Sequence, residues 1–339
     1  IKNMNNSSPT TTYGFTANPN NGFKPTTLAG LVANFQKNFL EKSIEIVPGL
    51  THNQYEVVKR TYFYIHQQFE SGPVDDNGDP KYFYDLITHR NDQATKNIDL
   101  DTKDVYIKAE TQGSYMKSWL LRREYMWYAK SSGWGKKLNT VSDDLPDFGT
   151  VVWKKVKLPN GRTDTQAVEL INLMNDPAAE CLKDGMVIER HLMLQHELRG
   201  KKSWNQDSVE KLIRGGKTVP KTAFLDTMPA STVSAYGYQI DESTPFYEVY
   251  EMWGEIPRSL YEQYKTGGKD RSGGKKKDPA IHQAPSQGAG SPDPKYDPNE
   301  SVYVMAIVSG IRSGETECVL FCKEVDRDMF PYKEVHFRR

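Results

Sequence analysis

Residues 149–174 read GTVVWKKVKLPNGRTDTQAVELINLM, and this stretch marks the place where the chain changes character. Residues 151–157 and 166–174 are two strand-like runs, and a Pro-Asn-Gly sequence lies between them. Asn160-Gly161 is the strongest short-range signal for a hairpin, because both residue types accept the positive φ angles of a tight turn. The stretch therefore predicts a β-hairpin, and the two sides of it can be examined separately.

The segment before the hairpin has the spacing of apolar residues that is typical of helices. One helix is predicted from about Thr27, and another from Thr51, where THNQ reads as a capping box. A third is predicted over residues 114–130 and ends at Gly133 and Gly135, since glycine is a natural C-terminal breaker. The apolar side chains that define these helices are Leu28, Leu31, Val32, Phe35 and Phe39 in the first, Tyr55, Val58, Tyr62, Ile65 and Phe69 in the second, and Trp119, Leu120, Met126 and Trp127 in the third.

The segment after the hairpin is predicted to be rich in strands. Residues 186–194 (MVIERHLML) and 246–257 (FYEVYEMWGEIP) alternate or carry many aromatic and β-branched side chains. Residues 301–310 and 316–325 flank a short turn and predict a second hairpin. The closing stretch 330–339, FPYKEVHFRR, is expected to be the neighbour of that hairpin.

Together these elements predict an α+β protein, in which a mainly helical part (residues 26–145) precedes a β-rich module (residues 146–339). Residues 1–25 are rich in Asn, Thr, Pro and Gly, and are predicted to form a flexible arm. Residues 267–300 consist largely of Gly, Pro, Ser and charged residues, and are predicted to be a flexible insertion between two strands that pair. The chain lacks an initiator Met and ends in a strand-like stretch, so it is expected to be incomplete at its C-terminus.

Composition argues against several classes of function. Lys+Arg and Asp+Glu each number 44 in 339 residues, so no overall charge draws the chain to nucleic acid or to a membrane. Three cysteines (Cys181, Cys318 and Cys322) are typical of a reducing compartment rather than of a disulfide framework. No apolar run approaches the roughly 18–20 residues that a membrane span needs.

The stretch ERHLMLQHEL places His191, His196 and Glu197 close together, which makes a metallohydrolase one hypothesis. A zincin helix carries two histidines at positions i and i+4, with a glutamate directly after the first. Here the second histidine comes one residue too late, and His191 lies in a predicted strand, so the two rings would point to opposite faces. We therefore predict no metal ligand here, and no catalytic or cofactor-binding residue in the chain.

Two other patterns are weaker still as sites. Cys318 and Cys322 share a face of a predicted strand but lie about 13 Å apart along it, too far to bind one zinc ion, so they are expected to be small core residues. A calcium loop counted from Asp75 would need Gly where Pro80 stands and Glu where Leu86 stands. That stretch is therefore predicted to be a polar turn.

One dense run of basic side chains lies in the predicted insertion: Lys269, Arg271, Lys275, Lys276 and Lys277. These residues could contact phosphate groups of a nucleic acid or an acidic partner. Their Gly-Ser setting suits a solvated loop, which is the favoured interpretation. The aromatic residues of 246–253 could stack on bases, but they are not interleaved with Lys or Arg, and a sheet core is favoured for them.

Several of these segments, in this order, resemble the portal proteins of tailed bacteriophages, especially the large portals of crAss-like and related short-tailed viruses. They are DLPDFGTVVWKKV at 144–156, AVELINLMNDPAAECLKDGMVIERHLMLQHEL at 167–198, YEVYEMWGEIP at 247–257 and VLFCKEVDRDMFPYKEVHFRR at 319–339. The resemblance covers about residues 119–339. It implies that this part is the β-rich wing of a portal, and that the long tunnel helices would follow Arg339.

The resemblance implies a structural protein of the virion and not an enzyme. Portal subunits form a closed ring, usually a dodecamer, at one vertex of the capsid, and assemble in the host cytoplasm. The implied partners are further copies of the chain, the major capsid protein, the terminase motor, the neck and tail adaptor proteins, and the double-stranded DNA that passes through the ring; no membrane is implied. Such a ring requires head-to-tail interfaces that close.

Two alternatives remain open at this point. Another virion component, such as a neck or head–tail connector protein, would carry a similar β-rich module. A metallohydrolase whose catalytic half lies elsewhere in its chain would use His191 together with Glu197.

Overall fold

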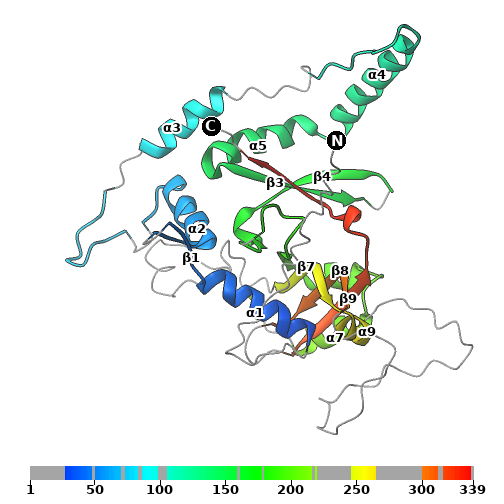
Figure 1. Ribbon diagram of the computed structural model, residues 1–339. Helices are drawn as coiled ribbons and strands as arrows, with labels where there is room; N and C mark the ends of the chain where they lie inside the picture. The colour runs from blue at the N-terminus through cyan, green and yellow to red at the C-terminus, as the bar shows by residue number, and fades with distance from the viewer. Residues whose placement is uncertain are drawn as a thin grey trace, which may run out of the picture.

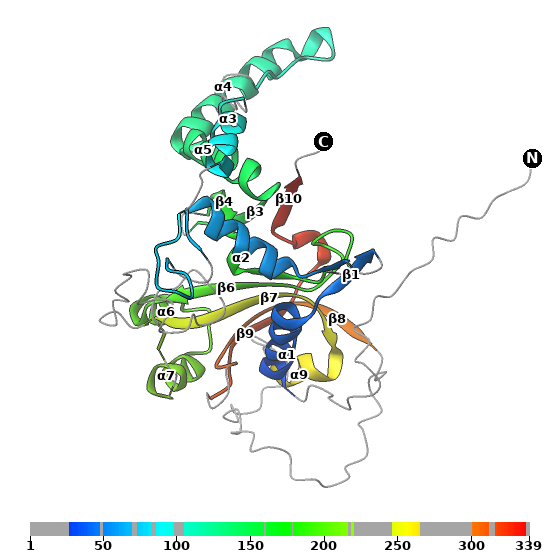
Figure 2. The same ribbon diagram turned by 90° about the vertical axis from the view of Figure 1, so that its left-hand side faces the viewer.

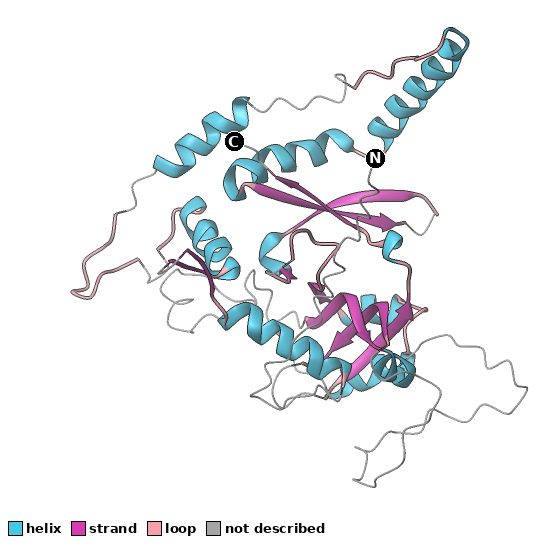
Figure 3. Ribbon diagram, in the orientation of Figure 1, coloured by secondary structure: helices cyan, strands magenta, loops and turns pink. Residues whose placement is uncertain are grey.

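The computed structural model describes residues 27–47, 50–69, 73–82, 86–97, 105–158, 161–177, 179–215, 218–219, 246–264, 300–311 and 316–336. Within these ranges helices gather in the N-terminal half of the chain and sheets in the C-terminal half, which confirms the predicted α+β class (Figures 1 and 3). The predicted arm (residues 1–25), nearly all of the predicted insertion and the five basic residues in it lie outside the described residues.

The described α-helices are α1 (Leu28–Glu41), α2 (Gln54–Ile65), α3 (Leu86–Asn97), α4 (Tyr115–Ser131), α5 (Trp134–Phe148), α6 (Gln195–Gly200), α7 (Gln206–Gly215) and α9 (Arg258–Tyr264). The described strands are β1 (Ile44–Val47), β2 (Leu50–His52), β3 (Thr150–Lys157), β4 (Thr163–Val168), β5 (Leu173–Asn175), β6 (Val187–Met193), β7 (Tyr247–Pro257), β8 (Ser301–Ser309), β9 (Cys318–Glu324) and β10 (Tyr332–His336). Short 3₁₀ turns are η2 (Gln112–Ser114), η3 (Leu170–Asn172) and η4 (Arg327–Met329).

A five-stranded antiparallel sheet, in the order β5-β6-β7-β8-β9, carries the main core. The aromatic strand β7 lies at its centre, and its Tyr247, Tyr250 and Trp253 are buried, as predicted for a core strand. Strands β7 and β8 flank the predicted insertion, and they pair from Tyr250 to Pro257, which confirms that part of the prediction.

Helix α1 covers one face of this sheet (Figure 2). Its five predicted apolar residues are all buried, and they pack with side chains of β7 and β8. The Thr27 hydroxyl accepts a hydrogen bond from the Gly30 amide at 3.0 Å, which satisfies one of the free amides at the start of the helix. This part of the fold therefore follows directly from the helical periodicity of the sequence.

A second sheet of three strands, in the order β10-β3-β4, contains the predicted hairpin. The closing strand was expected beside the β8–β9 hairpin, and that expectation is wrong. Strand β10 instead pairs with β3, from Tyr332 opposite Lys154 to His336 opposite Thr150. The η4 turn, capped by Asp326, redirects the chain after β9, so the strand reaches the other sheet.

Two predicted helix boundaries are also wrong. Thr51 lies in β2, and the cap of α2 is Asn53, whose side chain accepts a hydrogen bond from the Glu56 amide. Gly133 does separate two helices, with φ of +64°, but Gly135 lies inside α5 because a single left-handed residue is enough to redirect the chain.

The predicted strand 166–174 is in fact divided. Its first part belongs to β4, and its last residues belong to β5 in the other sheet, with the turn η3 between them. The chain therefore crosses from one sheet to the other within this run.

Candidate functional site

A cleft of about 1280 Å³ lies between the two sheets. Strands β3 and β4 form one wall, β6 and β7 form the other, and residues of α2 and α5 also line it. Three charged side chains meet there from different strands: Lys154 of β3, Glu189 of β6 and Glu251 of β7. The cleft therefore brings charged side chains of both sheets into one place.

The local geometry of β6 and β7 brings two carboxylates together. The strands are antiparallel, and Glu189 is directly opposite Glu251 in their register. Side chains alternate between the two faces of a strand, so His191 shares the face of Glu189 while Arg190 points to the other. Two glutamates in this position would repel one another unless a cation lies between them.

Lys154 supplies that cation. Its Nζ donates hydrogen bonds to Glu189 Oε2 at 2.5 Å and to Glu251 Oε2 at 2.7 Å. Lys154 is 8% exposed, so both ion pairs are largely shielded from water. The ammonium thus joins the three-stranded sheet to the five-stranded sheet through two carboxylates.

Two further donors complete the hydrogen bonding of the carboxylates. The hydroxyl of Tyr332, on β10, donates to Glu189 Oε2 at 2.7 Å. The indole Nε1 of Trp253 donates to Glu251 Oε1 at 2.8 Å. We call Lys154, Glu189, His191, Glu251 and Tyr332 the charged cluster.

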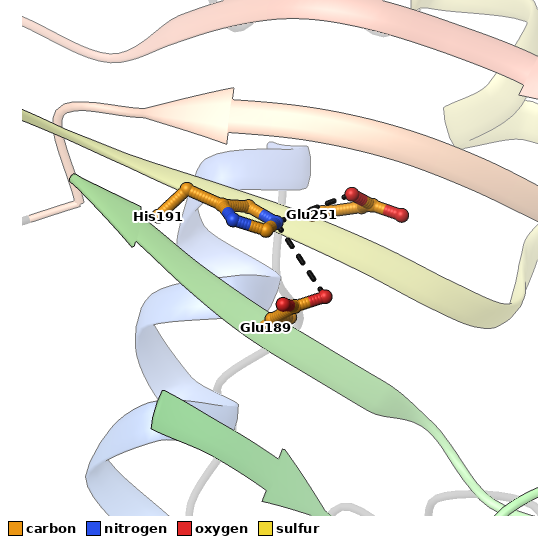
Figure 4. A group of neighbouring side chains, drawn as sticks. All are labelled: Glu189, His191 and Glu251. Carbon is orange, nitrogen blue, oxygen red and sulfur yellow. Dashed lines mark hydrogen bonds and ion pairs between the residues drawn. The ribbon is translucent and has the colours of Figure 1, made fainter. Parts of the chain in front are cut away.

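His191 is the most exposed member of the charged cluster, and its side chain is 33% exposed. Its Nε2 lies 3.2 Å from Glu251 Oε2 and 3.5 Å from Glu189 Oε2. Figure 4 shows the imidazole ring directed at both carboxylates. The ring adds a second polar contact to the same two oxygens that Lys154 binds.

Burial and charge act in opposite directions on these groups. Burial raises the pKa of Glu251, but the hydrogen bond from His191 and the charge of Lys154 outweigh it and lower that pKa to about 2. Burial, together with the charges of Glu251 and Glu189, raises the pKa of Tyr332 well above its ordinary value. The cluster is therefore built around ionised Glu251 and a Tyr332 that keeps its proton.

The other face of the same strand pair carries a second buried ion pair. Arg190 Nε donates to Glu248 Oε1 at 3.0 Å, and the hydroxyl of Tyr250 donates to Glu248 Oε2 at 3.3 Å. The Arg190 side chain is fully buried. Strands β6 and β7 thus hold ion pairs on both faces. On one face Arg190 of β6 meets Glu248 of β7, and on the other Lys154 of the three-stranded sheet meets Glu189 and Glu251.

A metal ion is the first alternative to consider for this geometry. Glu189, His191 and Glu251 offer one ligand atom each, and these three atoms lie within 4.8 Å of one another. The same two carboxylate oxygens, however, already bind the ammonium of Lys154. A divalent ion would have to displace Lys154 or accept a second cation beside it, so the donor set fits an ion-pair network better than a metal centre.

The wall formed by α5 is acidic. Burial, together with the charges of Asp147, Asp143 and Glu169, raises the pKa of Asp144 to about 6. Burial also raises the pKa of Asp147, although the amide of Asn91 donates to its Oδ1 at 2.6 Å and acts in the opposite direction. These carboxylates line the cleft but lie on another element than the charged cluster.

The residues of the metallohydrolase hypothesis do not come together as a zincin pair. His191 faces the cleft from β6, whereas His196 is exposed on α6. The carboxylate of Glu197 accepts a hydrogen bond from the Leu194 amide at 2.8 Å and so caps that short helix. The sequence spacing brought His196 and Glu197 into the hypothesis, but the actual neighbours of His191 are two glutamates.

The other singled-out residues agree with their structural interpretations. Cys318 and Cys322 are buried, and burial raises the pKa of both thiols. The stretch after Asp75 is a turn, in which Asp75 Oδ1 accepts hydrogen bonds from the amides of Asn77 and Asp79.

Helix α4 is the most unusual surface feature in the described part of the chain. It projects beyond α5 at one end of the molecule (Figures 1 and 2). Met116 is 63% exposed, Trp119 47%, Leu120 55% and Trp127 57%. The bulky residues predicted to form this helix do so, but they are not in the core.

These exposed residues share one side of the helix. Steps of three, four and seven residues place Met116, Trp119, Leu120 and Trp127 on one face, together with Arg123 and Lys130. The guanidinium of Arg123 lies 5.6 Å from the centre of the Trp119 ring. We call these six residues the α4 face. Its apolar side chains point to solvent, and so does Leu121 on another side of α4, so the helix does not pack an apolar stripe on its own core.

Sequence reasoning missed Glu189, Glu251, Lys154 and Tyr332 as members of one site. Glu189 and His191 form an i, i+2 pair on a predicted strand, which was an available signal for two polar groups on one face. The register that brings Glu251 opposite Glu189, and the β3–β10 pairing that brings Lys154 and Tyr332 near them, have no signal in the sequence.

Neither a protein-family model nor a curated protein sequence matches this chain. Among the helices in the described ranges, none combines the length and apolar character needed to cross a membrane.

Proposed function

We propose that the chain is a structural subunit of a homo-oligomeric assembly, and specifically the wing part of a portal ring at a capsid vertex. The single observation that carries this proposal is the α4 face. A helix of 17 residues that projects into water gains little stability from its own hydrogen bonds. Bulky apolar side chains on its exposed surface are typical of a surface that is buried against a partner. In an assembly, a neighbouring subunit would bury these apolar side chains.

The charged cluster supports the same proposal in a different way. Lys154 of β3 and Tyr332 of β10 both direct their donors at carboxylates of the five-stranded sheet, so these groups bind one another across the sheets. Such a network holds two sheets in one relative position, which suits a rigid part that must present surfaces to its neighbours. The resemblance of residues 119–339 to portal proteins supplies the particular assembly.

Under this proposal the partners are further copies of the chain, the major capsid protein, the terminase motor, the neck and tail adaptor proteins and the double-stranded DNA in the channel. The protein would act in the virion without catalysing a reaction. A neck or head–tail connector component would need a similar exposed surface and stays an alternative.

The test is the state of association of the complete protein. Mass photometry and cryo-electron microscopy of the full-length chain are expected to show closed rings of one defined size. A protein that stays monomeric at all accessible concentrations, under conditions that promote assembly, would contradict the proposal. Open oligomers without rings would favour the connector alternative.

The metallohydrolase alternative has one observation in its favour, the convergence of Glu189, His191 and Glu251. Elemental analysis of the purified wild-type protein distinguishes it. One equivalent of zinc, lost in His191→Ala, would support a metal centre, whereas metal-free protein with an unchanged fold agrees with the ion-pair network.

A further inference from the structure

The α4 face has a definite charge as well as an apolar character. Over its length α4 carries four basic side chains (Lys117, Arg122, Arg123 and Lys130) and one acidic one (Glu124). A partner for the α4 face should therefore offer apolar contacts together with carboxylates.

The chain itself presents such a surface in residues 74–82, which we call the acidic turn. An isolated bridge between Val74 and Pro80 closes it, and the Asp75 carboxylate accepts hydrogen bonds from two amides inside it, at 2.8 Å and 2.9 Å. Asp76 is exposed at its tip, and Asp79 is exposed next to the bridge. Tyr82 is 88% exposed beside them. The turn thus has a fixed shape, two outward carboxylates and an apolar edge.

We infer that the α4 face of one copy docks on the acidic turn of a second copy. Arg123 and Lys130 would meet Asp76 and Asp79, while Trp119 and its neighbours would cover Val74 and Tyr82. This inference rests on the proposed function for the closure of the contacts into a ring, but the contact itself needs only two copies of the chain.

The placement of the two surfaces determines the kind of contact. Figures 1 and 2 show α4 and the segment that contains the acidic turn on well-separated parts of the molecule. The α4 face therefore meets the acidic turn of another copy and not its own. A contact between two different patches is heterologous, and such contacts propagate head to tail until they close or form a filament.

A basic, aromatic helix face would also suit an anionic lipid surface. The acidic turn favours a second copy, because it offers carboxylates and exposed apolar groups on a rigid support within the same chain. Two α4 faces packed on each other would bring like charges together, which argues against a symmetric α4–α4 contact.

The experiment is a charge exchange in the full chain, followed by sedimentation velocity over a range of concentrations. We expect Arg123→Glu with Lys130→Glu to weaken self-association by at least about tenfold, and Asp76→Lys with Asp79→Lys to do the same. An equimolar mixture of the two double variants should recover association, since each altered surface finds its complement on the other chain. All four substitutions in one chain should associate like the wild type.

Lys117→Glu is the control, because it reverses one basic charge of α4 outside the α4 face and should leave association unchanged. Double variants that associate like the wild type, or a mixture that does not recover association, would overturn the inference.

Rings that form as in the wild type despite these substitutions would reject the contact but leave the proposed function intact. Association that depends on Arg123 without rings would support the contact and count against the portal. A monomeric wild type whose α4 binds phosphatidylglycerol vesicles would overturn the contact in favour of a membrane.

Discussion

Glu189 and Glu251 stand directly opposite each other on adjacent antiparallel strands, and one ammonium group, Lys154 Nζ, binds both of their Oε2 atoms. Two carboxylates in this register would destabilise the β6–β7 pair without that cation. The arrangement makes the stability of the five-stranded sheet depend on a residue of the other sheet.

Lys154→Met should destabilise the protein strongly. It leaves two nearly buried carboxylates without their main counter-ion, and removal of one partner of a buried ion pair typically costs about 3–5 kcal/mol. Urea denaturation followed by circular dichroism measures the change. Lys155→Met, next to it but exposed, is the control and should change the free energy of unfolding little. Adding Glu189→Gln to Lys154→Met should restore part of the loss, and a Lys154→Met protein as stable as the wild type would contradict the role of the cluster.

Acid should weaken the fold through Glu251. Its pKa is about 2 in the folded chain against an ordinary value of 4.5, so the folded state holds this group ionised where the unfolded state binds a proton. The stabilisation is present above pH 4.5 and is lost as the pH falls from 4.5 towards 2, by an amount on the order of 3 kcal/mol. The free energy of unfolding, measured at a series of pH values in this window, should fall more steeply with decreasing pH for the wild type than for Glu251→Gln. Equal slopes for the two proteins would show that Glu251 does not carry the effect.

Asp144 should act in the opposite sense. Its pKa of about 6 lies above the ordinary 3.8, so the folded chain retains a proton that the unfolded chain releases, and stability falls as the pH rises from 3.8 to about 6. Asp144→Asn should therefore stabilise the protein at neutral pH, by about 1 kcal/mol once solvent screening of this half-buried group is allowed for. Differential scanning calorimetry at pH 5 and pH 7.5 tests this, with Glu324→Gln, an exposed carboxylate on β9 that does not act on the pKa of Asp144, as control. A destabilised Asp144→Asn at neutral pH would refute the sign.

Metal ions should not stabilise the wild-type protein, because Lys154 already binds the carboxylates that a metal would need. In Lys154→Ala the same oxygens and His191 lose that cation, and added Zn²⁺ should then raise Tm. His191→Ala in the Lys154→Ala background should reduce this rise and serves as its control. Thermal shift assays with and without Zn²⁺ give the comparison, and a Zn²⁺-dependent rise of Tm in the wild type would contradict the ion-pair interpretation.

The spacing of apolar residues predicted those helices and strands that bury one continuous face. Helix α1, with its five buried apolar residues, and the β3–β4 and β8–β9 hairpins were predictable because local spacing and turn residues determine them. Helix α3 was missed, since its sequence LITHRNDQATKN has few apolar residues and no clear stripe. The cap of α2 was misplaced by two residues because Thr51 and Asn53 are both good capping residues.

The candidate site was much less predictable than the fold. The sequence drew attention to His191 but paired it with His196 and Glu197, the residues nearest along the chain. Its partners in space are Glu189 on β6 itself and Glu251 on β7, which lies 60 residues further along the chain. Pairing across strands depends on register and on the position of whole sheets, and neither is encoded within a short window of residues.

The sequence by itself determined the α+β class, the pairing of β3 with β4, the buried character of β7 and the spacing that makes α4 a helix, because these depend on neighbours a few residues apart. Only the tertiary structure decided that β10 pairs with β3, that Lys154 lies between Glu189 and Glu251, and that the apolar side of α4 points to solvent. Those features depend on which distant segments share the limited interior of the fold, and burial is settled by the chain as a whole.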